Sequence, residues 1–540
     1  MLPQTKTRTL CLGLLLALIC LIPATAYTQM RPDAGLILQD TLKREFQPLA
    51  PSVDSSPQGN TLIEIPNGGA RIWLNSIGFS GNNVFREEEL LSEVGDEIGK
   101  SHDLAGLRHI ANRISIFYRE NGYPFAWAYI PEQSMAGGEL VIEVVEGRYG
   151  KVSASGDPAL SAWAQRFLKT LRTGAVIEER GLQRAILILG GQPGVVVEPI
   201  IRPGEEIGTG DLELRAAEKP RISGRAGFDN HGNRYSGEYR GELRLWVNRA
   251  FTFGDEISLR ALYTNENMWL GQLDYSLPIG YSGLRGHAGY AHTAYDLMAP
   301  YEGYTGTAKV SKMGLSCPLV RSRLTNLAVY TMCQYKDLGN ELLGTSYEKK
   351  SSRSWLLGLQ FDHRDAFGGG GVTYGDISLT TGHLDSDNPG EAQGAFTKAN
   401  LEITRVQNLS SDLTLFLNAS GQWADGELDS SESFSLGGAN GVKAYPQGEG
   451  SGSAGWLAKA ELRYAANGCF APYLFYDAGN ISSDSTGASR GIAGAGIGLR
   501  YAYDDWSLDA SAAWTTHGGD ARSDDDQRSP RVWLRIERSF

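Results

Sequence analysis

The segment 235–247 reads YSGEYRGELRLWV, and its side chains alternate between two kinds. Successive residues of a β-strand point to opposite faces of the sheet, so this pattern predicts a strand with one largely apolar face and one charged face. The apolar face carries Tyr235, Gly237, Tyr239, Gly241, Leu243, Leu245 and Val247. The other face carries Ser236, Glu238, Arg240, Glu242, Arg244 and Trp246.

The same texture continues from about residue 220 to the end of the chain. Alternating segments such as 256–263 and 413–423 are separated by clusters of Gly, Asn, Asp and Ser, and the last segment closes with Phe540. A soluble β-sandwich also alternates, but about 320 residues of one texture exceed one ordinary sandwich. At roughly 20 residues per strand and connection the region holds about 16 strands, as in outer-membrane barrels with polar interiors. We therefore predict a 16-stranded antiparallel transmembrane β-barrel over residues 220–540.

The composition and charge agree with a β-rich protein and exclude one class of partner. The chain has 540 residues, of which 67 are Gly, 24 Tyr, 17 Phe and 11 Trp. Its formal net charge is 50 − 62 = −12, whereas a nucleic-acid-binding protein would usually carry a basic excess. We expect no nucleic-acid partner.

The N-terminus has the pattern of a secretory signal peptide over residues 1–26. Lys6 and Arg8 precede an apolar run over 10–22, and small residues follow it up to Ala26, after which we expect cleavage. The apolar run is too short for a bilayer-spanning helix, and no later stretch reaches ~18 consecutive apolar residues. The mature protein is therefore either exported and soluble or crosses a membrane as a β-barrel.

Three cysteines remain after cleavage, namely Cys317, Cys333 and Cys469. They are too few for a disulfide scaffold, so they are either isolated small apolar residues or include a Cys317–Cys333 bridge between neighbouring strands.

A helix and a linker precede the next folded region. Residues 31–46 have Leu38, Leu42 and Phe46 at four-residue spacing, which predicts a short amphipathic helix within a unit 27–48. A Pro- and Ser-rich linker over 49–69 follows. A lone helix must dock to be stable, and we expect it either to plug the barrel lumen or to lie on the periplasmic rim.

Residues 70–149 and 150–219 repeat the order strand, helix, helix, strand, strand. In the first unit we expect strands at 71–79, 125–130 and 140–145 and a long helix capped by Ser101. In the second unit we expect a strand near 151–153, helices at 158–171 and 178–189, and strands at 195–201 and 212–216. The strands 125–130 and 195–201 either present edges that can bind an extended chain or are covered by helices.

The sequence offers no support for enzyme chemistry. GDEIGKS at 95–101 has one residue too few between its glycines for a phosphate-binding loop. Gly494, Gly496 and Gly498 share one face of a strand and do not form a dinucleotide-binding turn. The eight His are scattered, and neither HExxH nor GxSxG occurs. We expect no catalytic residue, no metal site and no cofactor.

One Gly-rich segment, 433–464, reads SFSLGGANGVKAYPQGEGSGSAGWLAKAELRY and predicts a long loop that runs into a strand. The following FYDAGN places Asp477 on the same strand face as Tyr473 and Phe475. A carboxylate facing the lumen needs a partner, and otherwise this is a solvated loop beside an ordinary luminal acid.

Two of these stretches carry a family resemblance. LGGANGVKAY resembles the GG…VRGY loop signature of the two-partner secretion transporters (the TpsB family), and FYDAGN resembles their F-x-D-x-G strand motif. FSGNNVFREEEL at 79–90 resembles the start of their first POTRA domain, and DNHGNRYSGEYRG at 229–241 their first barrel strand. The family's order of plug helix, linker, two POTRA domains and 16-stranded barrel matches nearly the whole mature chain.

The resemblance implies a set of functional residues. The loop signature, expected to fold inward over about 437–455 and to gate the pore, comprises Gly437, Gly438, Val442, Lys443, Ala444 and Tyr445. The partner motif on the barrel wall comprises Phe475, Asp477 and Gly479. Lys443 and Ala444 stand where the signature has Arg and Gly. We therefore expect a looser Lys443–Asp477 pair than arginine would make, and a less tight turn at Ala444.

The resemblance also implies a function. We expect an outer-membrane transporter of a Gram-negative bacterium, with POTRA domains in the periplasm that bind an unfolded exoprotein of haemolysin or adhesin type in extended form. It would lie in outer-membrane lipid after insertion by the barrel assembly machinery, and would secrete without ATP. The alternatives are a BamA-like insertase, which resembles a longer periplasmic array without a plug, and a general porin, which needs neither POTRA domains nor the long loop.

Overall fold

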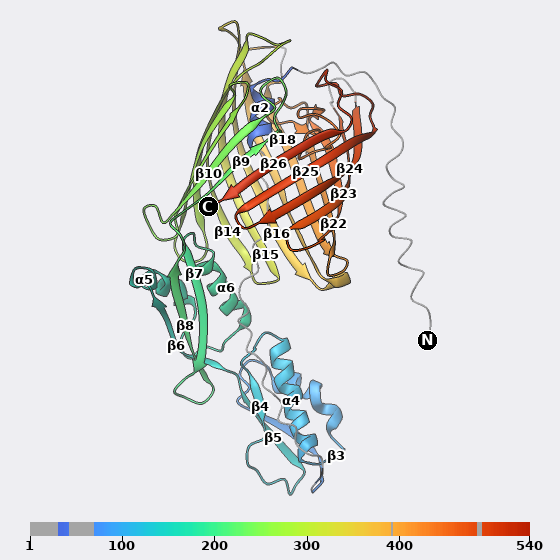
Figure 1. Cartoon of the computed structure of the whole chain (residues 1–540). Coiled ribbons are helices and arrows are strands. Elements are labelled where there is room, and N and C mark those ends of the chain that lie inside the picture. Colours follow the sequence, from blue (N-terminus) through green and yellow to red (C-terminus); the bar gives the residue numbers. More distant parts are fainter. Residues whose placement is uncertain (1–30, 43–67, 69, 390–391, 483–488) are drawn as a thin grey trace, which may run out of the picture.

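The computed structural model describes residues 31–42, 68, 70–389, 392–482 and 489–540. The expected signal peptide 1–26 and nearly all of the linker 49–69 lie outside these residues. A large β-barrel stands above two small domains that follow one another away from its lower end (Figure 1). No helix in the described ranges is long and apolar enough to cross a membrane.

The barrel is closed and antiparallel, which confirms the expected 16-stranded fold. Strands adjacent in sequence are neighbours in the sheet, except that β19 pairs with β22, and β26 closes the barrel on β9 through five residue pairs. The first eight strands are β9 (Ile222–Asp229), β10 (Arg240–Asn248), β11 (Glu256–Thr264), β12 (Trp269–Pro278), β13 (Arg285–Asp296), β14 (Tyr304–Arg321), β15 (Thr325–Leu342) and β16 (Thr345–Asp365). The others are β17 (Gly371–Ser386), β18 (Gly394–Asn408), β19 (Leu413–Ala424), β22 (Ala454–Tyr464), β23 (Phe470–Ser482), β24 (Ser489–Tyr503), β25 (Trp506–His517) and β26 (Arg531–Ser539).

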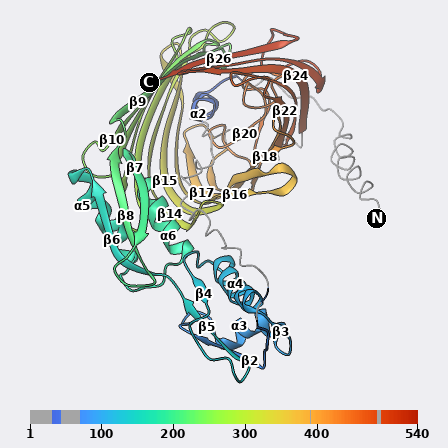
Figure 2. The same cartoon turned by 60° about the horizontal axis from the view of Figure 1, so that its bottom comes forward.

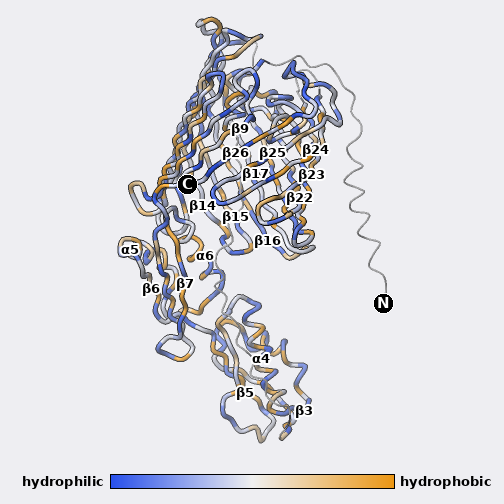
Figure 3. Tube along the Cα trace, viewed as in Figure 1, coloured by the Kyte–Doolittle hydropathy of each residue, from blue (hydrophilic) through white to orange (hydrophobic). Residues whose placement is uncertain are grey.

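The alternating pattern sorts side chains between the outside and the lumen. Leu243 of β10 and Leu259 of β11 lie on the exposed outer face. Glu242 lies on the inner side, where it accepts hydrogen bonds from Arg244 and Arg260. Hydrophilic and hydrophobic residues alternate along the barrel strands (Figure 3). The strand expected from residue 235 begins only at Arg240, because residues 230–239 form a connection in which Gly237 has a φ of +113°.

The two cysteines considered for a bridge are free. On the paired strands β14 and β15, Cys317 lies opposite Val329 and Cys333 opposite Met313, so the two thiols are out of register.

The first small domain contains the helices and strands expected over 70–149, except that the expected first strand is divided into two short strands, β1 and β2. Its sheet has the order β2 (Ser76–Ser80), β5 (Glu139–Val145), β4 (Trp127–Tyr129), and β1 (Ile72–Trp73) pairs separately with β3 (Ser101–His102). The helices are α3 (Glu87–Val94), followed by the short η1 (Gly95–Glu97), and α4 (Leu104–Glu120). The expected cap was wrong: Ser101 lies in β3, and the Asp103 side chain caps α4 by accepting from Gly106 N–H.

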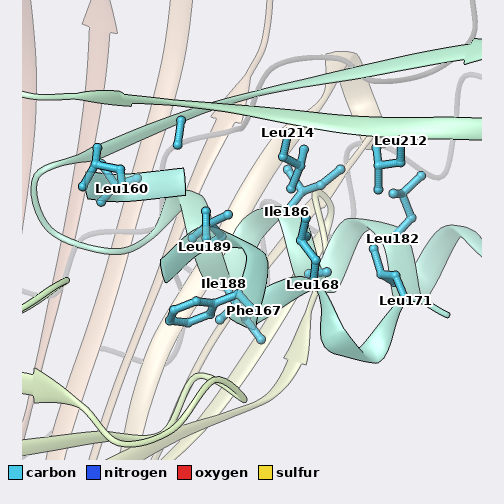
Figure 4. Close-up of a cluster of buried hydrophobic side chains, with 14 of the residues drawn as sticks. Leu160, Phe167, Leu168, Leu171, Leu182, Ile186, Ile188, Leu189, Leu212 and Leu214 are labelled. Atoms are coloured by element: carbon cyan, nitrogen blue, oxygen red, sulfur yellow. The ribbon is translucent and has the colours of Figure 1, made fainter. Parts of the chain in front are cut away.

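The second small domain repeats this arrangement. Its sheet has the order β6 (Arg148–Gly156), β8 (Thr209–Glu218), β7 (Val195–Pro203). One face is covered by α5 (Pro158–Phe167), η2 (Leu168–Thr170) and α6 (Glu179–Gly190), whose aliphatic side chains form the core with Leu212 and Leu214 (Figure 4).

The second domain is joined to the barrel by shared packing. Phe253, in the turn between β10 and β11, belongs to the hydrophobic cluster of this domain and lies 5.8 Å from the ring of Trp163. Arg184 of α6 donates to the carbonyls of Pro318 and Leu319 at the end of β14, at 2.9 and 3.2 Å. The domain and the lower turns of the barrel are therefore one packed unit.

The helix α2 (Ala34–Leu42) lies inside the barrel (Figure 2). Its residues Ala34, Ile37 and Leu38 are buried among luminal side chains of the wall. Of the two expected positions, the structure places the described part of the helix in the lumen, where its apolar face packs against an apolar part of the wall.

Candidate functional site: the loop inside the barrel and its wall

The connection between β19 and β22 folds into the lumen (Figure 2). It contains two short strands, β20 (Phe434–Ser435) and β21 (Ser451–Gly452), which pair with each other and close a compact loop. Within this loop Val442 N–H donates to the carbonyl of Leu436 at 2.8 Å, and both side chains are fully buried. The predicted signature residues therefore lie on a folded loop, held at its base by a small sheet.

Lys443 contacts the predicted partner on the wall. Its Nζ lies 3.2 Å from Oδ2 and 3.3 Å from Oδ1 of Asp477, and its backbone N–H donates to Oδ2 at 3.3 Å. The Asp477 side chain is completely buried and that of Lys443 is 9% exposed. Nζ also lies 4.3 Å from the ring centre of Phe475, so the ammonium sits over an aromatic face as well as beside a carboxylate.

Asp477 is presented by β23 together with the other two residues of its motif. Phe475, Asp477 and Gly479 alternate along the strand and face inward. A methyl group at position 479 would lie 2.7 Å from Cδ2 of Leu436, so glycine is needed there to let the loop approach the wall. The motif thus places an aromatic ring, a carboxylate and a glycine that leaves room for the loop on one strand face.

A second carboxylate and a second lysine complete the site, and neither was expected from the sequence. Oε1 of Glu461 lies 3.4 Å from Lys443 Nζ. Lys459 is the cross-strand neighbour of Asp477, and its Nζ donates to the carbonyl of Asn440 at 3.1 Å. Glu461 and Lys459 alternate with apolar residues in the strand just after the Gly-rich loop. That periodicity was the available signal.

Ala444 does not occupy the tight glycine conformation that the family signature suggested. It is not among the described residues with positive φ, so its side chain introduces no backbone strain. Instead, its methyl group packs against β24, where a methyl group at Gly494 would lie only 2.3 Å away. Gly496 and Gly498 on the same strand face leave similar room for the rings of Phe475 and Tyr473. The three glycines therefore leave space on one face of β24 for the loop and for the aromatic rings of β23.

Tyr445 and Glu449 tie the loop to the connection between β25 and β26. The Tyr445 hydroxyl lies 2.8 Å from the carbonyls of His517 and Gly519, and burial raises the pKa of Tyr445 to about 12. Glu449 accepts from Arg490 at 2.7 Å and from the backbone N–H groups of Arg522 and Ser523 at 2.8 Å. The loop is therefore also fixed to the part of the barrel wall that lies four to five strands along from its entry strand β19.

The two signature glycines form the start of the loop. Gly438 has a φ of +100°, a conformation that glycine adopts without cost. A methyl group at Gly437 would lie 2.4 Å from the carbonyl of Pro446, so the two arms of the loop touch there.

The segment before the loop forms a second charged contact with the wall. Glu432 lies between Lys336 of β15 and Lys398 of β18, at 2.5 and 2.7 Å. Burial alone would raise the pKa of Glu432, but the two ammonium groups outweigh it and hold the pKa at about 2. Asp429, three residues earlier, pairs with Lys350 at 2.7 Å.

This second contact reaches the luminal helix. Asp33 caps α2 by accepting from Leu36 N–H at 2.9 Å, and its other oxygen accepts from Ser430 Oγ at 2.7 Å. A methyl group at Gly35 would lie 2.5 Å from the backbone nitrogen of Ser431. At the far end of the helix, Gln447 of the loop donates to Asp40 at 2.6 Å. The loop and helix therefore hold one another inside the barrel.

The arrangement is electrostatic and steric in kind. Within the ranges that the structure describes, no three His, Cys, Asp or Glu side chains are placed to hold a metal ion. The buried charges meet opposite charges, as buried charges require. Such a site can hold or release a segment of chain.

The family described as "Haemolysin secretion/activation protein ShlB/FhaC/HecB" matches residues 208–501, which is more than half of the chain. The domain described as "POTRA domain, ShlB-type" matches residues 72–147. The heme/hemopexin transporter protein HuxB of Haemophilus influenzae is 28% identical over 413 residues, which cover 73% of this chain and 72% of that protein.

Solved structures share the fold. CdiB from Escherichia coli has a TM-score of 0.72 at 20% identity, over 90% of this chain and 93% of that one. CdiB from Acinetobacter baumannii has a TM-score of 0.66 at 18% identity, over 95% of this chain and 100% of that one. At these identities the likeness concerns the fold alone.

Proposed function

Because this chain belongs to the ShlB/FhaC/HecB family of haemolysin secretion/activation proteins, we propose that it moves one large exoprotein, unfolded and without ATP, from periplasm to cell surface. The family consists of two-partner secretion transporters, so the family assignment made from the sequence is confirmed. The chain is an outer-membrane β-barrel transporter with its POTRA domains in the periplasm.

The observation that carries the proposal is that two segments of the chain itself occupy the lumen. The helix α2 and the loop beginning at Gly437 are both anchored inside the barrel by buried polar contacts. A general porin needs neither segment, because its lumen serves free diffusion. A barrel closed in this way suits a cargo that must displace its own gate.

The energy source in this proposal is the folding of the exoprotein outside the cell. A protein that folds at the surface withdraws its unfolded form by mass action, and this gives the transport a direction. The transporter then acts as a binding scaffold and gated pore, and not as an enzyme. The barrel assembly machinery would insert it, and outer-membrane lipid would surround the exposed leucines of the outer face.

We further propose that the exoprotein is recognised by strand addition at the edge of β7. Two of the four sheet edges in the POTRA domains are covered by side chains: Ser115 of α4 accepts from Ala128 N–H on β4, and Gln165 of α5 contacts Ala154 and Val152 on β6. Of the two strands expected to offer an edge, only β7 has no side-chain cap among the described residues. Its prolines fit an edge position, since proline cannot donate to a sheet.

A BamA-like insertase remains the second candidate, but its longer periplasmic array is not matched by the two βααββ units described here. The deciding experiment deletes this gene and asks which large protein disappears from the culture medium. Complementation with the whole chain should restore that protein, whereas a chain lacking residues 70–219 should not, although its barrel still inserts. Secretion by the shortened chain would contradict recognition by the POTRA domains. Loss of many outer-membrane proteins together would favour the insertase.

A further inference from the structure

A row of apolar and small side chains crosses the inner wall of the barrel over five adjacent strands. Leu262, Leu270, Thr293, Ala308 and Leu338 are successive cross-strand neighbours on β11 to β15. All five are buried, with at most 3% of each residue exposed. We call this row, together with Ala291 and Val310 on the next row, the luminal furrow.

The furrow has a defined shape and charged ends. Ala291 pairs with Val310, and Val310 pairs with Lys336. The middle strands carry the small residues Thr293, Ala308 and Ala291, whereas larger leucines stand at both flanks. At one end Lys350 is the cross-strand neighbour of Leu338, and Lys336 is that of Val310. At the other end Glu242 is the neighbour of Leu262, and Arg260, two residues along β11, donates to Glu242. The surface therefore fits an aliphatic segment whose ends offer carbonyl or carboxylate oxygens.

The helix α2 satisfies each of these requirements. Ile37 and Leu38 lie in the same cluster as the furrow residues. At one end Asp33 is near Asp429 and Lys350, and at the other Arg260 donates to the carbonyl of Thr41. The helix has nine residues, and helices shorter than about 12 residues are marginal in water, so the furrow supplies most of its stability.

During transport the furrow loses the helix that covers it at rest. The lumen must be vacated by α2 for a polypeptide to pass, and the furrow would then be exposed to water. Exposure of apolar area to water is unfavourable, so an aliphatic segment of the passing chain would be drawn to the same place.

We propose that the luminal furrow is a binding site for aliphatic segments of the exoprotein during transport, and that α2 occupies it at rest as an internal substitute. The inference rests on the proposed function and adds the chemistry of the segment that the pore binds. That segment carries two or three aliphatic side chains on one face and an acidic or carbonyl group at each end. Release of α2 and entry of cargo are then one competitive exchange.

The first test uses the full chain with a photo-crosslinking phenylalanine derivative in place of Leu338, and a control with the same group at Tyr374 of β17, outside the furrow. The cargo is the exoprotein found by the gene deletion, fused to a disulfide-closed domain that stalls it in the pore. Position 338 should crosslink to α2 at rest and to the exoprotein when it is stalled. Capture of stalled exoprotein at position 374 while position 338 still captures α2 would overturn the proposal.

The second test separates cargo binding from plugging. Leu338→Asn and Val310→Asn should both raise resting conductance, because α2 is held less tightly, and should also lower secretion about tenfold, which corresponds to ~1.4 kcal/mol. A furrow that only holds the plug would give raised conductance with unchanged or faster secretion. Ser378→Asn, at an inward position of β17 outside the furrow, should behave as wild type, with barrel folding checked by heat-modifiable gel mobility. Absence of secretion by the wild-type chain would count against the proposed function, and not against the furrow.

Discussion

The methyl group of Ala444 lies against the backbone of Gly494, and this contact places the luminal loop on the wall of the barrel. A methyl group at position 494 would lie 2.3 Å from Ala444 Cβ, which is too close for two carbon atoms that are not bonded to each other. The larger residue in the loop signature is thus matched by a glycine fifty positions later, on β24.

We expect Gly494→Ala to displace the loop and reduce secretion, and Gly494→Ala combined with Ala444→Gly to restore most of it. The reason is steric, since only one of the two positions has room for a Cβ. The carbonyl of Trp514 would lie 3.1 Å from the new methyl group, so the rescue should be incomplete. Secretion at matched barrel abundance is the measurement. Ala444→Gly alone serves as control and should remain active, and a double variant no better than Gly494→Ala would refute the pairing.

Lys443→Ala and Asp477→Ala should each reduce secretion while the barrel stays in the membrane. Loss of one partner from a buried pair costs about 3–5 kcal/mol, because it leaves the other charge unpaired. Here Lys459 and Glu461 remain beside the vacant position and should reduce that cost. The double variant should be hardly worse than either single variant. Fully additive losses would show that the two residues act separately. Lys443→Arg should retain secretion if the pocket admits the larger head group.

Gly35→Ala should raise the single-channel conductance of the resting protein in planar bilayers. The added methyl group would lie 2.5 Å from the backbone nitrogen of Ser431, so the helix must move away from the loop segment. Gln39→Ala is the matched control on the same helix and should leave conductance unchanged. Removal of residues 27–48 should give the largest increase. An unchanged conductance after that removal would mean that the helix does not close the pore.

Resting conductance should fall as the pH is lowered through the range between the raised pKa of Asp33 and 3.8. Burial raises the pKa of the Asp33 carboxyl above its ordinary value of 3.8, and Asp429 acts in the same direction, opposed by Lys350. A carboxyl whose pKa is raised in the docked state binds a proton more tightly there, so docking is weakened above the raised value and strengthened below it. The effect lies between 3.8 and the raised pKa. Asp33→Asn should abolish this dependence, and a variant with the same pH profile as wild type would assign it to another group.

Val196→Lys should reduce secretion about tenfold if β7 receives the exoprotein strand, since lysine on an edge strand opposes pairing. Val196 is 43% exposed, so the substitution should not disturb the core. Val141→Lys is the matched control, because Val141 is 40% exposed but lies on the central strand β5. The measurement is the amount of exoprotein secreted by the two full-length variants at matched barrel abundance. Equal losses of secretion in the two variants would argue against edge pairing.

The sequence predicted those parts of the fold that follow from local periodicity. Alternation of side chains indicated the barrel, the length of the region gave its strand number, and the three-to-four spacing indicated the long helix of the first POTRA domain. Local patterns were weaker at element boundaries: Ser101 and Asp103 are both good caps, and only the pairing of β1 with β3 determines which of them is used. Likewise, the strand expected from Tyr235 starts at Arg240 because Tyr235 packs in the lumen beside α2.

The site was only half predictable for a related reason. Lys443 and Asp477 were found because both lie in recognisable motifs. Glu461 and Gly494 lie on other strands, and their contact with the loop depends on barrel register, which no local pattern fixes. The apolar character of the luminal furrow was missed because its residues come one or two at a time from five strands.

The sharing of Phe253 has a consequence for how the protein matures. The core of the second POTRA domain includes this ring, yet the ring belongs to the barrel turn between β10 and β11, which comes later in the chain and takes its place only when the barrel forms. Until then, the space between Trp163 and Phe167 is an open apolar socket on a periplasmic domain. Completion of the barrel fills that socket, so the domain reaches its final rigidity only when biogenesis is finished. A half-assembled transporter would thus be distinguishable, by chaperone and protease alike, from one ready to export.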